Sequence, residues 1–271
     1  MTQKMIAIDL DGTTLNDQHE LTPTTIDVLQ QVAALGHKIV IVTGRPFRNS
    51  KEIYEQIGVG GPIVNFNGGY CHHPQDENWE YTYKKLVPNH VAKKIAELFP
   101  SLEKATVLMA ETNRLVYSTL LEIPDKTYFP EGTEIVPLTP EDLGKEKINC
   151  LTLFSDKKDQ AELRHLLLKA FPDEIDVRTW GGTFPCLEIV AKQVEKSVGV
   201  KHLAQVWNIS QENILAFGDE DNDREMLSFA GLGVAMKNAI DDLKQLADDV
   251  TPLTNDENGL AEYLKEYFQL S

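Results

Sequence analysis

The sequence contains few cysteines and no long apolar run. Its three cysteines, Cys71, Cys150 and Cys186, are odd in number and lack the spacing of a metal site, so we expect free thiols in a reducing compartment. The N-terminal apolar stretch is interrupted at Asp9, and no segment approaches the roughly 20 apolar residues of a membrane span. These absences exclude a membrane partner and predict a cytoplasmic location.

Basic residues are also scarce, with 26 Lys and Arg against 42 Asp and Glu and a net charge of -16. Such a chain repels a phosphate backbone, which argues against nucleic acid as a partner. Hydrophobic residues make up 42% of the chain and charged residues 25%, an ordinary globular composition. We expect a folded protein, either a monomer or a weak homo-oligomer.

Apolar runs and helical periods alternate at both ends of the chain, with continuous runs typical of strands covered on both faces. Strands are expected at 5–10, 38–45, 62–67, 187–192, 214–219 and 232–236, and helices at 22–35, 47–57, 196–207, 223–230 and from 239. This alternation predicts an α/β fold with a doubly wound parallel sheet.

The alternation is lost between 84 and 187, so we expect a core of 1–83 and 188–271 with an inserted domain of 84–187. The insertion carries 14 basic and 16 acidic residues, which leaves most of the negative charge on the core.

Two carboxylates end the first strand in Asp9-Leu10-Asp11-Gly12-Thr13. Residues two apart leave a strand on the same face, so both can address one reacting atom. A carboxylate attacks phosphorus when a divalent cation offsets the repulsion, and a second carboxyl can transfer protons. We assign the attack to Asp9 and the proton transfer to Asp11, although Asp-Gly is also a common turn.

Phosphate-binding groups are expected at two further strand ends. Thr43-Gly44-Arg45 follows the second strand, and a hydroxyl beside an unhindered backbone N–H can hold phosphate oxygens. Lys196 begins a helix and can neutralise a phosphoryl group, with Lys192 and Lys201 as rival candidates.

An acidic segment, Gly218-Asp219-Glu220-Asp221-Asn222-Asp223, follows the strand at 214–219. Oxygen ligands suit Mg²⁺, so Asp219 is the best candidate ligand, supported by Asn222 and Asp223. A helix N-cap explains only part of this segment. In open α/β sheets ligands bind at the carboxyl ends of the strands, where all four motifs converge.

In this order the motifs DLDGT, TGR, Lys and GDEDND resemble the haloacid dehalogenase superfamily, and more narrowly its Cof-type phosphatases. The resemblance spans nearly the whole chain and implies a Rossmann-like core with a large α/β cap inserted between the second and third motifs. The cap is expected to set substrate specificity.

The resemblance also implies a role for each motif residue. Asp9 is then the nucleophile and a Mg²⁺ ligand, and Asp11 is the acid and base and a ligand through its backbone carbonyl. The implied phosphate contacts are Leu10 through its backbone, Thr43, Gly44, Lys196 and Asn222, and the implied further Mg²⁺ ligands are Asp219 and Asp223. Ser197 departs from the family, which commonly has Gly after the lysine. NFNGG at 65–69 is similar to the family's Asn-Gly loop before the cap.

The expected function is therefore Mg²⁺-dependent hydrolysis of small phosphate monoesters, such as sugar phosphates, nucleotides or phosphorylated cofactors, through an aspartyl phosphate on Asp9. A phosphomutase with the same intermediate and a non-catalytic sugar-phosphate-binding protein are the alternatives. A receiver-type signalling module is disfavoured by the paired carboxylates and the insertion.

Overall fold

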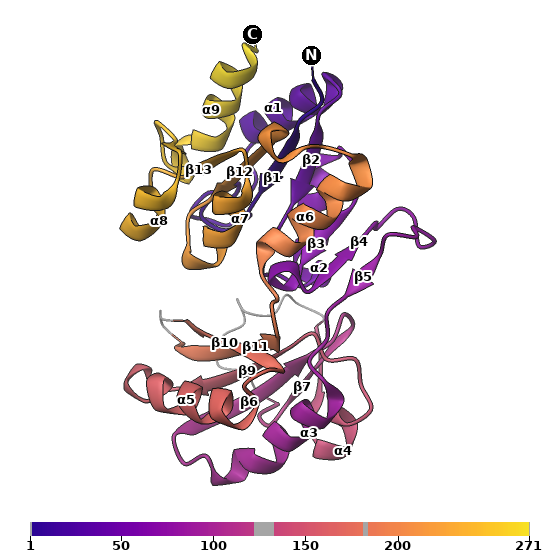
Figure 1. Cartoon of the computed structure of the whole chain (residues 1–271), viewed down its shortest axis with the longest axis vertical. Helices are drawn as coiled ribbons and strands as arrows, with labels where there is room; N and C mark the ends of the chain where they lie inside the picture. Colours follow the sequence, from indigo (N-terminus) through magenta and orange to yellow (C-terminus); the bar gives the residue numbers. More distant parts are fainter. Residues whose placement is uncertain (1, 122–132, 181–183, 271) are drawn as a thin grey trace. The chain divides into compact units, whose positions relative to one another are not determined.

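The computed structural model describes residues 2–121, 133–180 and 184–270. It divides the chain into two compact units (Figure 1). Unit 1 consists of Met1–Tyr83 and Glu195–Ser271, and unit 2 consists of Lys84–Val194. Each unit has a sheet and a hydrophobic core of its own.

Unit 1 is built on a parallel sheet with the strand order β14-β13-β12-β1-β2. Its strands are β1 (Met5–Ile8), β2 (Lys38–Ile41), β12 (Ile214–Gly218), β13 (Leu232–Ala235) and β14 (Asp249–Val250). Ile8 lies opposite both Ile41 and Phe217, so the residues that follow β1, β2 and β12 emerge at one edge.

A smaller sheet, β3 (Ile63–Asn65), β4 (Tyr70–His72) and β5 (Tyr83–Lys84), follows in the order β3-β4-β5. β3 joins the edge of the large sheet through a parallel bridge between Val42 and Val64. The end of β3 therefore lies beside the end of β2.

Helices cover both faces of the large sheet, as its continuous apolar strands require. α1 (Pro23–Ala34) packs against α2 (Phe47–Ile57) and α9 (Gly259–Phe268), while α6 (Lys196–Trp207) packs against α7 (Arg224–Phe229), which contacts α8 (Asp241–Leu246). Figure 1 shows α6 and α7 in front of the strands and α1 behind them. The predicted doubly wound α/β fold is confirmed.

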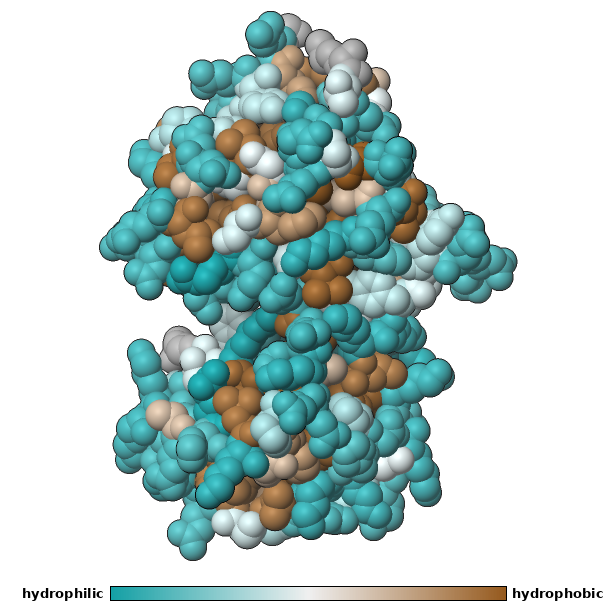
Figure 2. Space-filling view, viewed as in Figure 1, coloured by the Kyte–Doolittle hydropathy of each residue, from teal (hydrophilic) through white to brown (hydrophobic). Residues whose placement is uncertain are grey.

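The central strands carry the core of unit 1. All four residues of β1 and all five of β12 are buried. On the face shown in Figure 2, hydrophilic side chains cover most of the surface of both units. Each fully buried Leu, Ile or Phe contributes about 1.5–3 kcal/mol through removal from water, so this core fixes the position of the loops at the sheet edge.

Unit 2 has a six-stranded sheet with the order β10-β11-β9-β6-β7-β8. Its strands are β6 (Ala105–Glu111), β7 (Leu115–Ser118), β8 (Glu134–Pro137), β9 (Cys150–Ser155), β10 (Ile175–Trp180) and β11 (Cys186–Ala191), and its helices are α3 (Asn89–Leu98), α4 (Pro140–Leu143) and α5 (Gln160–Ala170). Leu108, Leu151 and Ile189 belong to its hydrophobic core.

β11 differs from the sequence-based expectation, which placed 187–192 in the parallel sheet of the core. It lies between β10 and β9 in unit 2 and is antiparallel to both. The boundary expected at 187/188 consequently lies at Val194/Glu195. An apolar segment indicates a strand but does not identify the sheet to which that strand belongs, which explains the difference.

None of the helices in the described part of the chain is both long and apolar enough to cross a membrane.

Candidate active site

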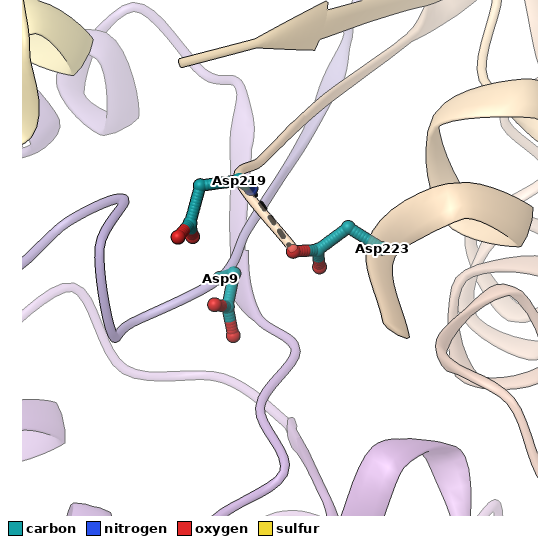
Figure 3. A group of neighbouring side chains, drawn as sticks. All are labelled: Asp9, Asp219 and Asp223. Carbon is teal, nitrogen blue, oxygen red and sulfur yellow. Dashed lines mark hydrogen bonds between the residues drawn. The ribbon is translucent and has the colours of Figure 1, made fainter. Parts of the chain in front are cut away.

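Three carboxylates meet at the edge of the large sheet in unit 1. Asp9 follows β1, Asp219 follows β12, and Asp223 ends the short helical turn η5 (Asp221–Asp223) before α7. Each offers an oxygen, and the three oxygens lie within 4.8 Å of one another (Figure 3). Parallel register alone brings the first two together, because β1 and β12 are neighbours. We call these residues the acidic triad.

Asp223 is fixed by hydrogen bonds to the loop before it. Its Oδ2 accepts from the backbone N–H of Asp219 at 3.1 Å, drawn in Figure 3, and from that of Glu220 at 3.2 Å. Asp223 is fully buried. A buried carboxylate that accepts backbone hydrogen bonds has little freedom to turn away, so the loop presents Asp223 to the triad.

Lys196 provides a cation inside this group. It begins α6, is fully buried, and places Nζ 2.7 Å from Asp9 Oδ1 and 2.6 Å from Asp223 Oδ1. Of the rival lysines, Lys192 pairs with Asp176 in unit 2 and Lys201 pairs with Glu195 on the surface. The structure therefore brings Lys196, and neither rival, to the predicted nucleophile.

The acidic triad and Lys196 do not balance in charge. Burial raises the pKa of Asp9, and Lys196 opposes this effect. The negative charges of Asp223 and Asp219 raise the pKa of Asp9 further. Burial and Asp223 raise the pKa of Asp219 to about 7. Burial lowers the pKa of Lys196, but the negative charges of Asp223 and Asp9 have the larger effect, so the pKa of Lys196 is raised.

When all three carboxylates are ionised, the one ammonium leaves two uncompensated negative charges in a region shielded from water. A divalent cation with a preference for oxygen ligands offsets them, so these residues fit Mg²⁺.

The loop after β1 is shaped around Asp219. Gly12 has φ +69°, and a Cβ on it would lie 2.2 Å from Asp219 Oδ2. Thr13 donates its hydroxyl hydrogen to Asp219 Oδ1 at 2.8 Å, and the Thr14 hydroxyl donates to the Asp9 carbonyl. Sequence reasoning assigned no role to Thr13 or Thr14, although both follow the DLDG motif directly.

Asp11 lies apart from the acidic triad. Its carboxylate accepts two hydrogen bonds from the Arg45 guanidinium, one of them from Nε at 2.8 Å, and His19 Nδ1 lies 3.3 Å away. Burial favours the neutral form, but the hydrogen bonds and charge of Arg45 outweigh it, so the pKa of Asp11 is lowered. The sequence did not predict these contacts, which come from Arg45 after β2 and from His19, eight residues after Asp11.

The remaining predicted phosphate contacts also lie at this edge. Thr43 is buried, and its Oγ1 accepts from the backbone N–H of Arg45 at 3.1 Å. Asn222 donates from Nδ2 to Asn67 Oδ1 at 2.9 Å, and Asn67 in turn lies against Gly44. Leu10 is fully buried, and its carbonyl accepts hydrogen bonds from the backbone N–H groups of residues 13–15. Their contacts with phosphate stay predictions.

Comparison with known proteins agrees with this arrangement. Residues 6–264 match the family of haloacid dehalogenase-like hydrolases. The chain is 37% identical over 279 residues to 5-amino-6-(5-phospho-D-ribitylamino)uracil phosphatase YitU of Bacillus subtilis, with 98% of both chains covered.

Solved structures show the same similarity. A haloacid dehalogenase-like hydrolase from Bacteroides thetaiotaomicron superposes with a TM-score of 0.84 at 26% identity, covering 98% of this chain and 100% of that one. TM0651 from Thermotoga maritima gives a TM-score of 0.82 at 28% identity, covering 98% of this chain and 97% of that one. The chain belongs to the haloacid dehalogenase-like hydrolases and, as its motifs and relatives agree, is a Cof-type phosphatase that hydrolyses phosphoric monoesters.

Proposed function

We propose that the protein is a Mg²⁺-dependent phosphatase that hydrolyses small phosphate monoesters through an aspartyl phosphate on Asp9. The observation that carries this proposal is the buried Lys196 bridging Asp9 and Asp223, with Asp219 beside them. A phosphoryl group at Asp9 would have a fixed ammonium next to the attacking oxygen and carboxylates suited to a cation. This is the charge arrangement that phosphoryl transfer to a carboxylate requires.

Asp9, Asp219 and Asp223 would hold the Mg²⁺, with the Asp11 backbone carbonyl as a further ligand. When bound, the ion reduces the repulsion between the carboxylate and the phosphate dianion and offsets charge on the phosphoryl oxygens.

In the first half-reaction an Asp9 carboxylate oxygen forms a bond to phosphorus while the bond from phosphorus to the ester oxygen breaks. Asp11 supplies the proton that the leaving oxygen takes. Since Arg45 favours the ionised form of Asp11, this step requires Asp11 to move away from the guanidinium and take up a proton. Lys196 and the Thr43 loop hold the phosphoryl oxygens.

In the second half-reaction water attacks the phosphorus of the aspartyl phosphate. Asp11, now ionised, accepts the proton of that water, the bond between phosphorus and the Asp9 oxygen breaks, and inorganic phosphate leaves. Asp9 and Asp11 are thereby restored. Lys196 stays charged throughout: Asp223 and Asp9 stabilise the ammonium in the free protein, and Asp223 and the phosphoryl oxygens do so while Asp9 carries the phosphoryl group.

Unit 2 is proposed as the cap that selects the substrate. The relative YitU acts on a uracil that carries a phosphorylated ribityl chain. At 37% identity over nearly the full length this chemistry supports phosphorylated sugars or sugar alcohols, with or without an attached ring, as the substrate class. 5-Amino-6-(5-phospho-D-ribitylamino)uracil is the compound to test first.

The test is phosphate release from this compound, p-nitrophenyl phosphate and a set of sugar and nucleotide phosphates, with Mg²⁺ or with EDTA. Asp9→Asn should lower turnover by roughly 10⁴-fold or more, and EDTA should abolish it. A burst of phosphoenzyme that is absent in Asp9→Asn would support the intermediate.

Two other outcomes would contradict the proposal. Return of phosphate to a second hydroxyl of the substrate, without release of inorganic phosphate, would identify a mutase. Turnover that survives in Asp9→Asn or without a divalent cation would rule out the proposed nucleophile or cofactor.

A further inference from the structure

The turn Phe66–Gly68, called η1, has an unusual backbone. Phe66 and Asn67 both have φ +52°, and Gly68 has φ +95°. Left-handed φ costs an ordinary residue roughly 1–2 kcal/mol, while Asn and Gly tolerate it better. Such a conformation persists only where the surroundings hold it, and it concentrates at functional sites. The contacts of η1 identify what holds it.

The first contact is with the loop after β2. The backbone N–H of Asn67 donates to the Thr43 carbonyl at 3.0 Å, and that of Phe66 donates to the Arg45 carbonyl at 3.4 Å. A Cβ at Gly44 would lie 3.1 Å from Asn67 Oδ1. The turn is therefore seated on the predicted phosphate-binding loop.

The second contact is with Asn222, whose Nδ2 donates to Asn67 Oδ1 at 2.9 Å. An amide NH₂ has two hydrogens, so this bond leaves one for a phosphate oxygen. Within the described ranges, the buried Asn222 Oδ1 has no hydrogen-bond partner. The bond to Asn67 therefore sets the rotation of the Asn222 amide.

The third contact is with the start of α6. A Cβ on Gly68 would lie 2.0 Å from the Glu195 carbonyl oxygen and 3.3 Å from the Lys196 nitrogen, so only glycine fits. On its other side, the Gly68 carbonyl accepts from the Tyr83 hydroxyl at 2.9 Å. The turn thus packs on the backbone that carries Lys196.

We propose that Asn67 is a positioning residue for phosphate binding. Its side chain holds the Asn222 amide in place, and its turn sets the distances between the Thr43 loop, Asn222 and Lys196. Asn67 acts through Asn222 and does not itself contact the phosphate. This inference rests on the proposed function, because it assigns phosphate to the same edge of the sheet.

The test is a double-mutant cycle between Asn67→Gly and Asn222→Ala. Glycine keeps the left-handed turn and removes only the amide. Inorganic phosphate binding is measured by calorimetry with Mg²⁺ present, beside KM and kcat. Each single variant should weaken phosphate binding and raise KM by roughly 10-fold, and the double variant should be little worse than either one. Additive effects, or unchanged phosphate binding in Asn67→Gly, would overturn the proposal.

Asn67→Asp provides the matched control, since Asp also tolerates positive φ and keeps an acceptor oxygen for Asn222 Nδ2. In the Asn67→Asp background, Asn222→Ala should weaken phosphate binding as much as it does in the wild type. A smaller loss of binding would count against the proposal. If Asn67→Gly folds poorly, this second pair of variants still tests the proposal. A wild-type protein that neither binds phosphate nor releases it from any ester would instead contradict the proposed function.

Discussion

At the scale of single residues, the site depends on how closely a few side chains approach one another. Lys196 contacts two carboxylates, and Gly12 leaves room for a third. Buried charges in such contact depend strongly on each partner, because the loss of one leaves another uncompensated. Small changes of volume at this edge should therefore affect cation binding before they affect the fold.

Gly12→Ala tests this dependence, with Gly36→Ala as the matched control. Both glycines have positive φ, +69° and +91°, so both variants should lose roughly 1–2 kcal/mol of folding stability. The new methyl at position 12 would lie 2.2 Å from Asp219 Oδ2, whereas no atom lies within 4 Å of one at position 36.

Calorimetric titration with Mg²⁺ should show affinity reduced at least roughly 10-fold in Gly12→Ala and unchanged in Gly36→Ala. Equal affinities in the two variants would refute the role given to Gly12.

The raised pKa of Asp219 predicts a pH dependence of stability in the metal-free protein. Its pKa is 3.8 in model peptides and about 7 when folded, so between these values the folded state binds more protons than the unfolded state. The free energy of unfolding should then fall as pH rises from about 4 to about 7.

Thermal unfolding in EDTA should show a steeper decline of Tm over pH 5–7 for the wild type than for Asp219→Asn. Identical slopes would show that Asp219 does not titrate in this range. Addition of Mg²⁺ should flatten the wild-type slope, since the cation replaces the proton.

The motif residues were predictable because their spacing relative to strand ends is local in sequence. Asp9, Lys196, Asp219 and Asp223 were named from the sequence, and the structure brings them together. The bonds of Arg45 and His19 to Asp11 were not predictable. Arg45 lies in a different loop, and the contact of His19 depends on the conformation of the loop that it shares with Asp11. Asn67 had only a weak signal, an Asn-Gly pair after a strand.

At the scale of elements, β11 shows the limit of apolar patterns. Its apolar run predicted a strand, and β11 is a strand with five of its six residues buried, but within the sheet of unit 2. Pattern and propensity are local, whereas the choice of partner strand depends on the packing of the whole unit.

Ile189→Ala checks which unit β11 stabilises. Ile189 is fully buried in the core of unit 2, so the substitution should cost that unit roughly 2–5 kcal/mol. Amide hydrogen exchange should accelerate in β9 and β10 and stay unchanged in β1 and β12.

Ile6→Ala in β1, also fully buried, is the control and should give the reverse pattern. Faster exchange of β1 in Ile189→Ala would contradict the assignment of β11.

At the scale of the whole molecule, two cores and an uneven charge distribution separate the units. Most of the net charge of -16 lies outside residues 84–187. The parallel sheet of unit 1, its helices on both faces and the interruption by an insertion were all predictable, because each leaves a periodic or compositional signal. The C-terminal boundary of the insertion was not predictable, because no turn signal distinguishes Val194 from earlier positions.

Gly68 lies where the inserted unit 2 joins unit 1. The chain leaves unit 1 after Tyr83 and returns at Glu195, and both residues contact this one glycine. The entry and exit points of the insertion are therefore neighbours within unit 1, and a linker of a few residues is enough to join them. Because loop closure costs little more for a long insertion than for a short one, the length of the segment inserted at this point should have little effect on the stability of unit 1.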